Sequence, residues 1–93
     1  MPHQMSDLDK KRQLLFGKNV LRIRIEKGLS QDDVAARCRV TKGSISVIEN
    51  GDRNFQFSSL LGLAKGLGVH PKELLDIDFE LDKEDDINIH KLK

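Results

Sequence analysis

SQDDVAARCRVTKGSISVIENG, residues 30–51, is the stretch of sequence that decides the fold. Ser30 and Thr41 each carry a hydroxyl that accepts a hydrogen bond from the free N–H groups at the start of a helix, so each predicts a helix beginning at the next residue. We expect one helix over 31–38 and a second from residue 42 to 49 or 50. Two short helices joined by so tight a turn have the spacing of a helix-turn-helix unit, in which the first helix supports the second.

Three further helices are predicted around this unit. Apolar residues recur at three- and four-residue steps before it, which predicts a helix from residue 7 or 10 to 27. Behind it, Ser58 and Ser59 are the expected caps of a helix that runs to Leu67, and Pro71 suits the first position of a last helix that ends near Leu75. Glycines that adopt left-handed backbone angles are expected to end the helices, and these are Gly28, Gly51 and Gly68. The sequence therefore predicts an all-α fold of five helices.

The composition places these helices in one small domain. The chain has 93 residues, of which 38% are hydrophobic and 33% are charged, and that length supplies one core rather than two. No apolar run is long enough to span a membrane or to form a secretory signal. The single cysteine, Cys38, excludes an internal disulfide and suits a reducing cytoplasm, which is the expected location. Because Trp and Tyr are absent, no aromatic platform for stacking single-stranded bases is expected.

Charge divides the chain into a basic body and an acidic tail. Residues 1–75 hold 13 Lys and Arg against 8 Asp and Glu, which gives +5, whereas residues 76–93 hold 3 against 7, which gives −4. A basic body attracts a polyanion, and an acidic tail is then expected on a face turned away from it. Ordinary solvated surface explains both charge runs equally well.

The tail differs from the body in its apolar period. Apolar and polar residues alternate over 77–81 and again over 87–89, which is typical of half-buried strands, and the polar segment 82–86 suits a turn between them. We expect a short C-terminal β appendage. An isolated hairpin is marginal in water, so its strands are expected to pair with those of a second subunit and form a dimer contact. The alternative is a disordered acidic segment.

Small and apolar side chains divide the helix-turn-helix unit into an inner and an outer face. Ala35 is expected at the close approach of the two helices, where a larger side chain would push them apart. The inner face comprises Val34, Cys38, Val40, Ile45 and Ile48. The outer face of the second helix comprises Lys42, Gly43, Ser44, Ser46 and Val47. The major groove of B-form DNA is about 12 Å wide, so it admits a helix that presents such a face.

Short motifs occur in order along the helical part: Gly28-Leu29-Ser30-Gln31, Val40-Thr41-Lys42-Gly43-Ser44-Ile45-Ser46, Ile48-Glu49-Asn50-Gly51 and Leu63-Ala64-Lys65-Gly66-Leu67-Gly68-Val69. Together they resemble the Cro and phage-repressor family of helix-turn-helix proteins, over residues 16–75. The resemblance implies a five-helix, lambda-repressor-like domain over 1–75 that binds operator DNA as a symmetric dimer. The acidic tail over 76–93 lies outside it.

The resemblance also implies which residues contact DNA. Those expected over the bases are Thr41, Lys42, Gly43, Ser46 and Val47. Those expected on the sugar-phosphate backbone are Gln31, Ser44, Asn50 and Arg53. The chemistry agrees, because amide and hydroxyl donors near helix N-termini suit phosphate oxygens. Lys42 is the best candidate for reading a base, since its ammonium donates to guanine O6 and N7.

The family further implies an ion pair between Arg24, on the first helix, and Glu49, at the end of the recognition helix. If the pair is buried, the loss of either partner leaves an unpaired charge and costs about 3–5 kcal/mol. The alternative is a solvated pair worth less than about 1 kcal/mol. Both partners are therefore predicted as structural residues, together with Ala35.

Two positions depart from the family pattern. Arg39 stands in the turn where the family generally has glycine, at a position that tends to require a positive φ and costs a non-glycine residue on the order of 1 kcal/mol. Either the turn differs slightly from the family pattern, or the strain is tolerated for a basic side chain near a phosphate. Gly43 has no side chain to donate to a base, so the recognition helix is expected to depend more on close backbone approach and DNA shape.

Catalytic and metal sites are not predicted. His3, His70 and His90 have no ligand spacing, and no nucleophile has an evident base partner, so neither an enzyme nor a cofactor is expected. The sequence predicts a sequence-specific transcription regulator, chiefly a repressor that binds a near-palindromic operator as a homodimer. The alternatives are an antitoxin-type protein, whose tail binds a protein partner, and a restriction-modification controller protein.

Overall fold

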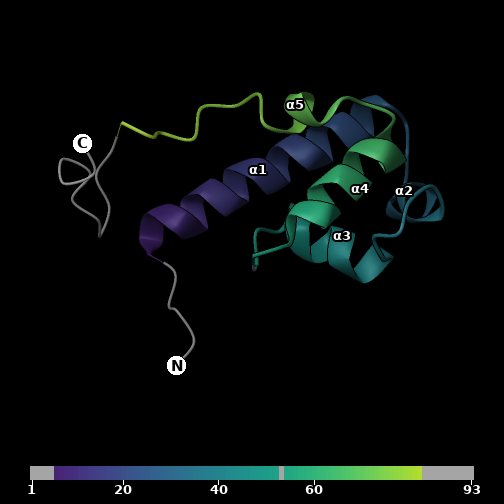
Figure 1. The fold of residues 1–93 in the computed structure, drawn as a ribbon, viewed down its shortest axis with the longest axis horizontal. Coiled ribbons are helices and arrows are strands. Elements are labelled where there is room, and N and C mark those ends of the chain that lie inside the picture. The colour runs from purple at the N-terminus through teal and green to yellow at the C-terminus, as the bar shows by residue number, and fades with distance from the viewer. Residues whose placement is uncertain (1–5, 53, 83–93) are drawn as a thin grey trace.

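The computed structural model describes residues 6–52 and 54–82. They form an all-α fold whose helices are α1 (Asp7–Glu26), α2 (Gln31–Ala36), α3 (Lys42–Glu49), α4 (Phe57–Leu67) and α5 (Pro71–Leu74). The long α1 runs through the molecule and packs against α3 and α5, while α4 packs against α2 and α5 (Figure 1). The prediction of five helices is confirmed. Of the helices in the described ranges, none is long and apolar enough to cross a membrane.

Local hydrogen bonds explain where the two helices of the helix-turn-helix unit begin. Ser30 Oγ accepts a hydrogen bond from the backbone N–H of Asp33 at 2.9 Å, and the Ser30 N–H donates to the Asp33 carboxylate at 2.8 Å. These bonds form a capping box, and donation by the Ser30 N–H is the main reason that the pKa of Asp33 is lowered. Thr41 Oγ1 likewise accepts from the Ser44 N–H at 3.1 Å. Both predicted caps are confirmed.

The predicted start of α4 is wrong. The helix begins at Phe57, with Gln56 as its N-cap and no side-chain hydrogen bond from that cap, so Ser58 and Ser59 lie inside the first turn. A tertiary contact lies just before the helix, because the ring of Phe55 stacks on that of Phe16 with centroids 4.9 Å apart. The helix start is thus preceded by a packing contact with α1 and has no serine cap.

Of the two alternatives for the turn of the helix-turn-helix unit, the structure has the one in which the turn differs from the family pattern. Among the residues that the structure describes, only Glu80 combines a side chain with a positive φ, so Arg39 is not in the left-handed region. The reason is that α2 ends at Ala36, earlier than expected, with Arg37 in a right-handed conformation. Five residues then connect α2 to α3, and the chain reverses without a left-handed position. Arg39 is therefore not strained.

All five helices contribute side chains to the core. Its largest fully buried side chains include Val20 of α1, Val34 of α2, Ile45 of α3 and Leu63 of α4. Gly17 lets α1 and α3 approach closely, since a Cβ at this position would lie 2.2 Å from the backbone oxygen of Ile48. The recognition helix is thus seated directly on the backbone of α1.

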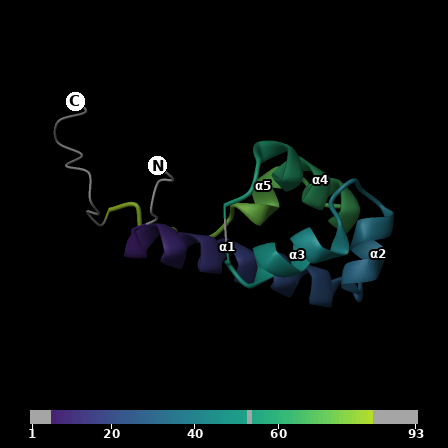
Figure 2. The same cartoon turned by 90° about the horizontal axis from the view of Figure 1, so that it is seen from below.

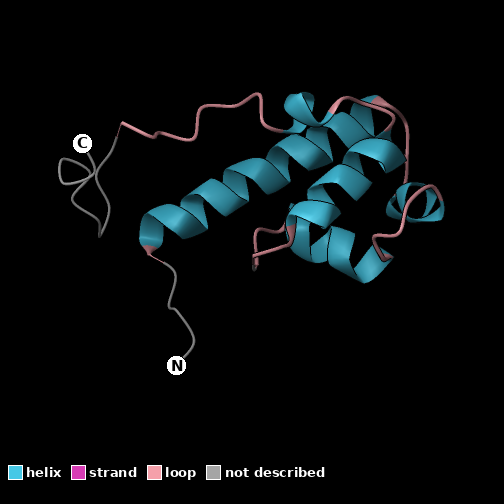
Figure 3. Cartoon of the chain, in the orientation of Figure 1, coloured by secondary structure: helices cyan, strands magenta, loops and turns pink. Residues whose placement is uncertain are grey.

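The predicted strand over 77–81 is absent, and Figure 3 shows no strand in the described part of the chain. After α5 the chain instead runs back along α1, where the Arg12 guanidinium donates to the backbone oxygens of Phe79 at 2.8 Å and Glu80 at 2.9 Å. Lys11 adds an ion pair to the Glu80 carboxylate at 2.7 Å. Residues 87–89 and most of the predicted turn lie outside the described residues.

Candidate nucleic-acid interface

The first half of α3 forms an exposed polar surface. The helix buries Ile45, Ile48 and Glu49 toward the core. The residues predicted to contact DNA lie on its other side, where Thr41, Lys42, Gly43, Ser44 and Asn50 are exposed and Ser46 and Val47 are half-buried. Figure 2, which views the molecule from below, shows α3 with no other helix in front of it. The geometry leaves this surface free to enter a groove.

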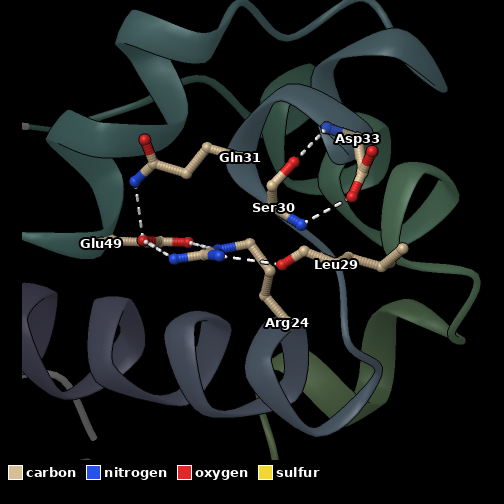
Figure 4. A network of polar contacts seen from close by, with 6 residues as sticks. All are labelled: Arg24, Leu29, Ser30, Gln31, Asp33 and Glu49. Carbon is tan, nitrogen blue, oxygen red and sulfur yellow. Dashed lines mark hydrogen bonds and ion pairs between the residues drawn. The ribbon is translucent and has the colours of Figure 1, made fainter.

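A buried ion pair fixes the C-terminal end of α3 to α1. Arg24 Nε lies 2.6 Å from Glu49 Oε2 and its Nη2 lies 3.0 Å from Oε1, while Nη1 donates to the backbone oxygen of Leu29 at 2.9 Å (Figure 4). The side chains are only 14% and 5% exposed. The hydrogen bonds to Glu49 raise the pKa of Arg24, against the opposing effect of burial. The structure therefore has the buried form of the pair rather than the solvated one.

Gln31 joins this ion pair. Its side-chain Nε2 donates to Glu49 Oε1 at 2.9 Å, so the first residue of α2 is tied to the last residue of α3 (Figure 4). An amide nitrogen has two N–H donors, and this bond uses one of them. The second remains for the phosphate contact that the family resemblance implies. The sequence did not predict the bond to Glu49, because it depends on how the two helices are placed.

Lys42, the predicted reader of a base, lies at the first position of α3. Its Nζ is 3.2 Å from the carboxylate of Asp32 on α2, and both side chains are largely exposed. The next residue, Gly43, leaves open space, since nothing lies within 4 Å of where its Cβ would be. Sequence reasoning missed Asp32, and only its position in the first turn of α2 would have suggested that it faces α3.

A groove of about 540 Å³ opens beside α3. On the α3 side it is lined by Thr41, Gly43, Ser44 and Val47, and on the opposite side by Asn54, Gln56 and Ser59. Sequence reasoning missed Asn54 and Gln56, since no local pattern distinguishes them from ordinary loop residues. Arg53, which was predicted to contact the DNA backbone, lies outside the described residues.

Ala35 and His70 have structural roles, in packing and in capping. Ala35 is half-buried and packs against the core between α2 and its neighbours. His70 caps α5, because its Nδ1 accepts from the Lys72 N–H at 3.1 Å. Within the described ranges, no group of His, Cys, Asp or Glu side chains is arranged to hold a metal ion.

Comparisons with known proteins found a matching family model, two similar proteins and two similar solved structures. A family model described as Helix-turn-helix matches residues 20–74. Control protein C.BamHI of Bacillus amyloliquefaciens is 44% identical over 64 residues, which are 68% of this chain and 79% of that protein. The uncharacterized HTH-type transcriptional regulator y4dJ of Sinorhizobium fredii is 43% identical over 61 residues, 66% of this chain and 79% of that protein.

Among solved structures, the restriction-modification controller protein C.AhdI from Aeromonas hydrophila superposes with a TM-score of 0.64 at 32% identity. The match covers 67% of this chain and 94% of C.AhdI. The clp gene regulator ClgR from C. glutamicum has a TM-score of 0.63 at 23% identity, over 69% of this chain and 83% of ClgR, and shows a shared fold alone. Both solved structures therefore share the fold of this chain.

Proposed function

The chain belongs to the helix-turn-helix family of DNA-binding transcription regulators, and from this premise we propose that it is a restriction-modification controller protein that binds a specific double-stranded DNA site. The fold is the lambda-repressor-like arrangement of five helices, and the family is not one of enzymes. Two of the similar proteins described above are named as control or controller proteins, and C.AhdI is matched over 94% of its length. These similarities favour a controller over a phage-type repressor.

The exposed N-terminal half of α3, seated on α1 by Glu49 and Arg24, is the observation that carries the proposal. A rigid helix with a polar outer face is the element that enters a major groove, and the ion pair keeps this helix from tilting when it does so. The hydroxyls and the exposed ammonium on that face can donate hydrogen bonds to base edges and to phosphate oxygens.

The contacts that we propose follow from side-chain chemistry and position. Lys42 donates to a guanine. Other contacts over the bases come from Thr41, Gly43, Ser46 and Val47. Contacts to the phosphate backbone come from Gln31, Ser44, Asn50 and Arg53. Because Gly43 has no donor, its part is to let the DNA approach the helix backbone closely.

We further propose that two copies bind together on a near-palindromic site. Two recognition helices about 34 Å apart would enter successive major grooves on one face of the duplex. Binding that overlaps a promoter would repress it. Light scattering of the full chain, alone and with duplex, tests the dimer, and a single copy on each duplex would contradict it.

A second candidate function is that of an antitoxin-type regulator with a protein partner. The observation in its favour is the acidic segment after α5, where Asp76 and Asp78 are exposed and are available to a basic partner. Co-purification of a basic protein that is lost when residues 76–93 are removed would support this function over that of a controller.

Selection of bound duplexes from a random pool tests the main proposal. We expect a defined sequence with two-fold symmetry. Lys42→Ala should then lower the preference for one base by about 1–3 kcal/mol. Lys72→Ala is the matched control, since Lys72 is an exposed lysine on α5, which lies across the molecule from α3 (Figure 1). A chain that forms no salt-sensitive complex with any duplex would overturn the proposal.

A further inference from the structure

The ion pair between Asp32 and Lys42 lies at the edge of the proposed DNA-binding surface. It joins the second residue of α2 to the first residue of α3, with Lys42 Nζ 3.2 Å from Asp32 Oδ2. The side chains are 73% and 59% exposed. An ion pair this exposed contributes at most about 1 kcal/mol to stability. The ion pair itself is therefore not a major source of stability.

Asp32 lies in the first turn of α2, where its negative charge stabilises the helix by about 0.3–1 kcal/mol, but it does not cap the helix. The capping box of that helix is formed by Ser30 and Asp33, which supply the side-chain acceptor and the returning carboxylate. A second carboxylate beside the recognition helix faces an unfavourable potential when the phosphates of a duplex approach. The charge of Asp32 therefore acts on DNA binding as well as on the helix that carries it.

The chemistry of an ammonium group suggests what that role is. A lysine ammonium has three N–H donors on a flexible four-carbon stem, and by itself it is attracted to any phosphate. When one donor is held by Asp32, two remain, and guanine presents two acceptors, O6 and N7, in the major groove. Among the described residues, Asp32 is the only side chain that hydrogen-bonds the Lys42 ammonium. Gly43 beside it has no side chain that would orient the lysine.

We infer that Asp32 is a specificity-determining residue that positions Lys42. Its carboxylate holds the ammonium so that the two remaining donors are presented to a guanine, and it keeps the same ammonium from contacts with phosphates of any sequence. The inference rests on the proposed function, because it assumes that α3 enters a major groove. It adds a residue from the supporting helix to those that choose the DNA sequence.

The test compares Asp32→Asn with Glu26→Gln in the full chain. Glu26 is a matched control, because it also forms an exposed ion pair, with Arg22 at 2.8 Å, and its substitution removes the same charge. The probes are the duplex that the wild-type chain selects from a random pool, its single-base variants and a random-sequence duplex. Binding is measured at several salt concentrations, and circular dichroism establishes that both variants are folded.

Asp32→Asn should reduce discrimination at the base that Lys42→Ala affects by about tenfold. It should also strengthen binding to the random duplex more than Glu26→Gln does, and should steepen the dependence of log K on log salt by about 0.9, as expected for one more phosphate contact. In the Lys42→Ala background, Asp32→Asn should cause no further loss of discrimination, because the group that it positions is gone.

The outcomes separate this inference from the proposed function. If the wild-type chain selects a sequence and Asp32→Asn behaves as Glu26→Gln does, the inference is wrong and the proposed function stands. If Lys42→Ala changes the preference at no base, the inference and the proposed guanine contact of Lys42 are both wrong, whereas sequence-specific DNA binding by the chain stands. If the wild-type chain selects no sequence at all, both are wrong.

Discussion

Gly17→Ala should weaken the fold at the contact that seats the recognition helix. A Cβ added at this position would lie 2.2 Å from the backbone oxygen of Ile48, 2.7 Å from that of Glu49 and 2.9 Å from the Glu49 carbonyl carbon. Ordinary van der Waals contact begins at 3.4 Å, so α1 and α3 must separate by about 1.2 Å at the closest of these contacts. All three atoms belong to the backbone, and no side-chain rotation relieves the overlap.

The expected loss follows from two opposing effects. Overpacking a core position costs about 1–3 kcal/mol, and the upper end applies because the end of a helix must move. Alanine regains roughly 1 kcal/mol through its higher helix propensity. The free energy of unfolding should therefore fall by about 2 kcal/mol. For a domain of this size, that loss lowers Tm by about 8–16 °C.

Gly43→Ala is the matched control for this prediction. It makes the same change within a helix, but nothing lies within 4 Å of the added Cβ. Helix propensity then acts alone, and Gly43→Ala should raise the free energy of unfolding by about 0.5–1 kcal/mol. Urea unfolding followed by circular dichroism measures both variants. A Gly17→Ala variant as stable as the wild-type chain would refute the close approach of α1 and α3.

Two further substitutions test the polar contacts around α2 and α3. Arg24→Met should reduce the free energy of unfolding by about 3–5 kcal/mol, because it leaves the buried Glu49 carboxylate without its counter-ion. Urea unfolding measures this loss. A loss below about 1 kcal/mol would mean that the ion pair is solvated. Asp33→Asn should destabilise the chain at neutral pH and progressively less in acid. The pKa of Asp33 is lowered in the folded chain, so its contribution is complete above the ordinary aspartate pKa and is lost as pH falls through the folded value. Thermal unfolding of the wild-type chain and of Asp33→Asn, from neutral pH down into acid, measures the difference in Tm. This difference should become smaller as the pH falls.

Features that depend on a few neighbouring residues could be predicted from the sequence. The caps at Ser30 and Thr41 are made by hydrogen bonds to residues three positions away, and the glycines expected to end helices, Gly28, Gly51 and Gly68, all have a positive φ between 69° and 72°. Because these interactions lie within one turn of backbone, residue type and spacing contain the information that determines them.

Features that join separate helices could not be predicted in the same way. Phe55 stacks on Phe16 just before α4 begins, and the bonds of Glu49 to Gln31 and of Lys42 to Asp32 cross from one helix to another. Each depends on the relative placement of elements that the chain separates by 10 or more residues. The family resemblance supplied the pair of Arg24 with Glu49, which no local pattern in this sequence indicates.

The segment after α5 shows what an alternating pattern does and does not imply. A period of two means that alternate side chains are buried, and the structure satisfies it over 77–79, with Ile77 and Phe79 packed against the core and Asp78 exposed. The pattern ends there, because Leu81 is 70% exposed. It does not require a partner strand, because a backbone oxygen also accepts from a side chain, as that of Phe79 does from Arg12. The described residues 77–81 thus form no strand in the single chain, and the dimer contact through the tail stays a prediction. The segment lies above α1 in Figure 1, whereas α3 lies below it, so these acidic residues are on the opposite side of α1 from the recognition helix.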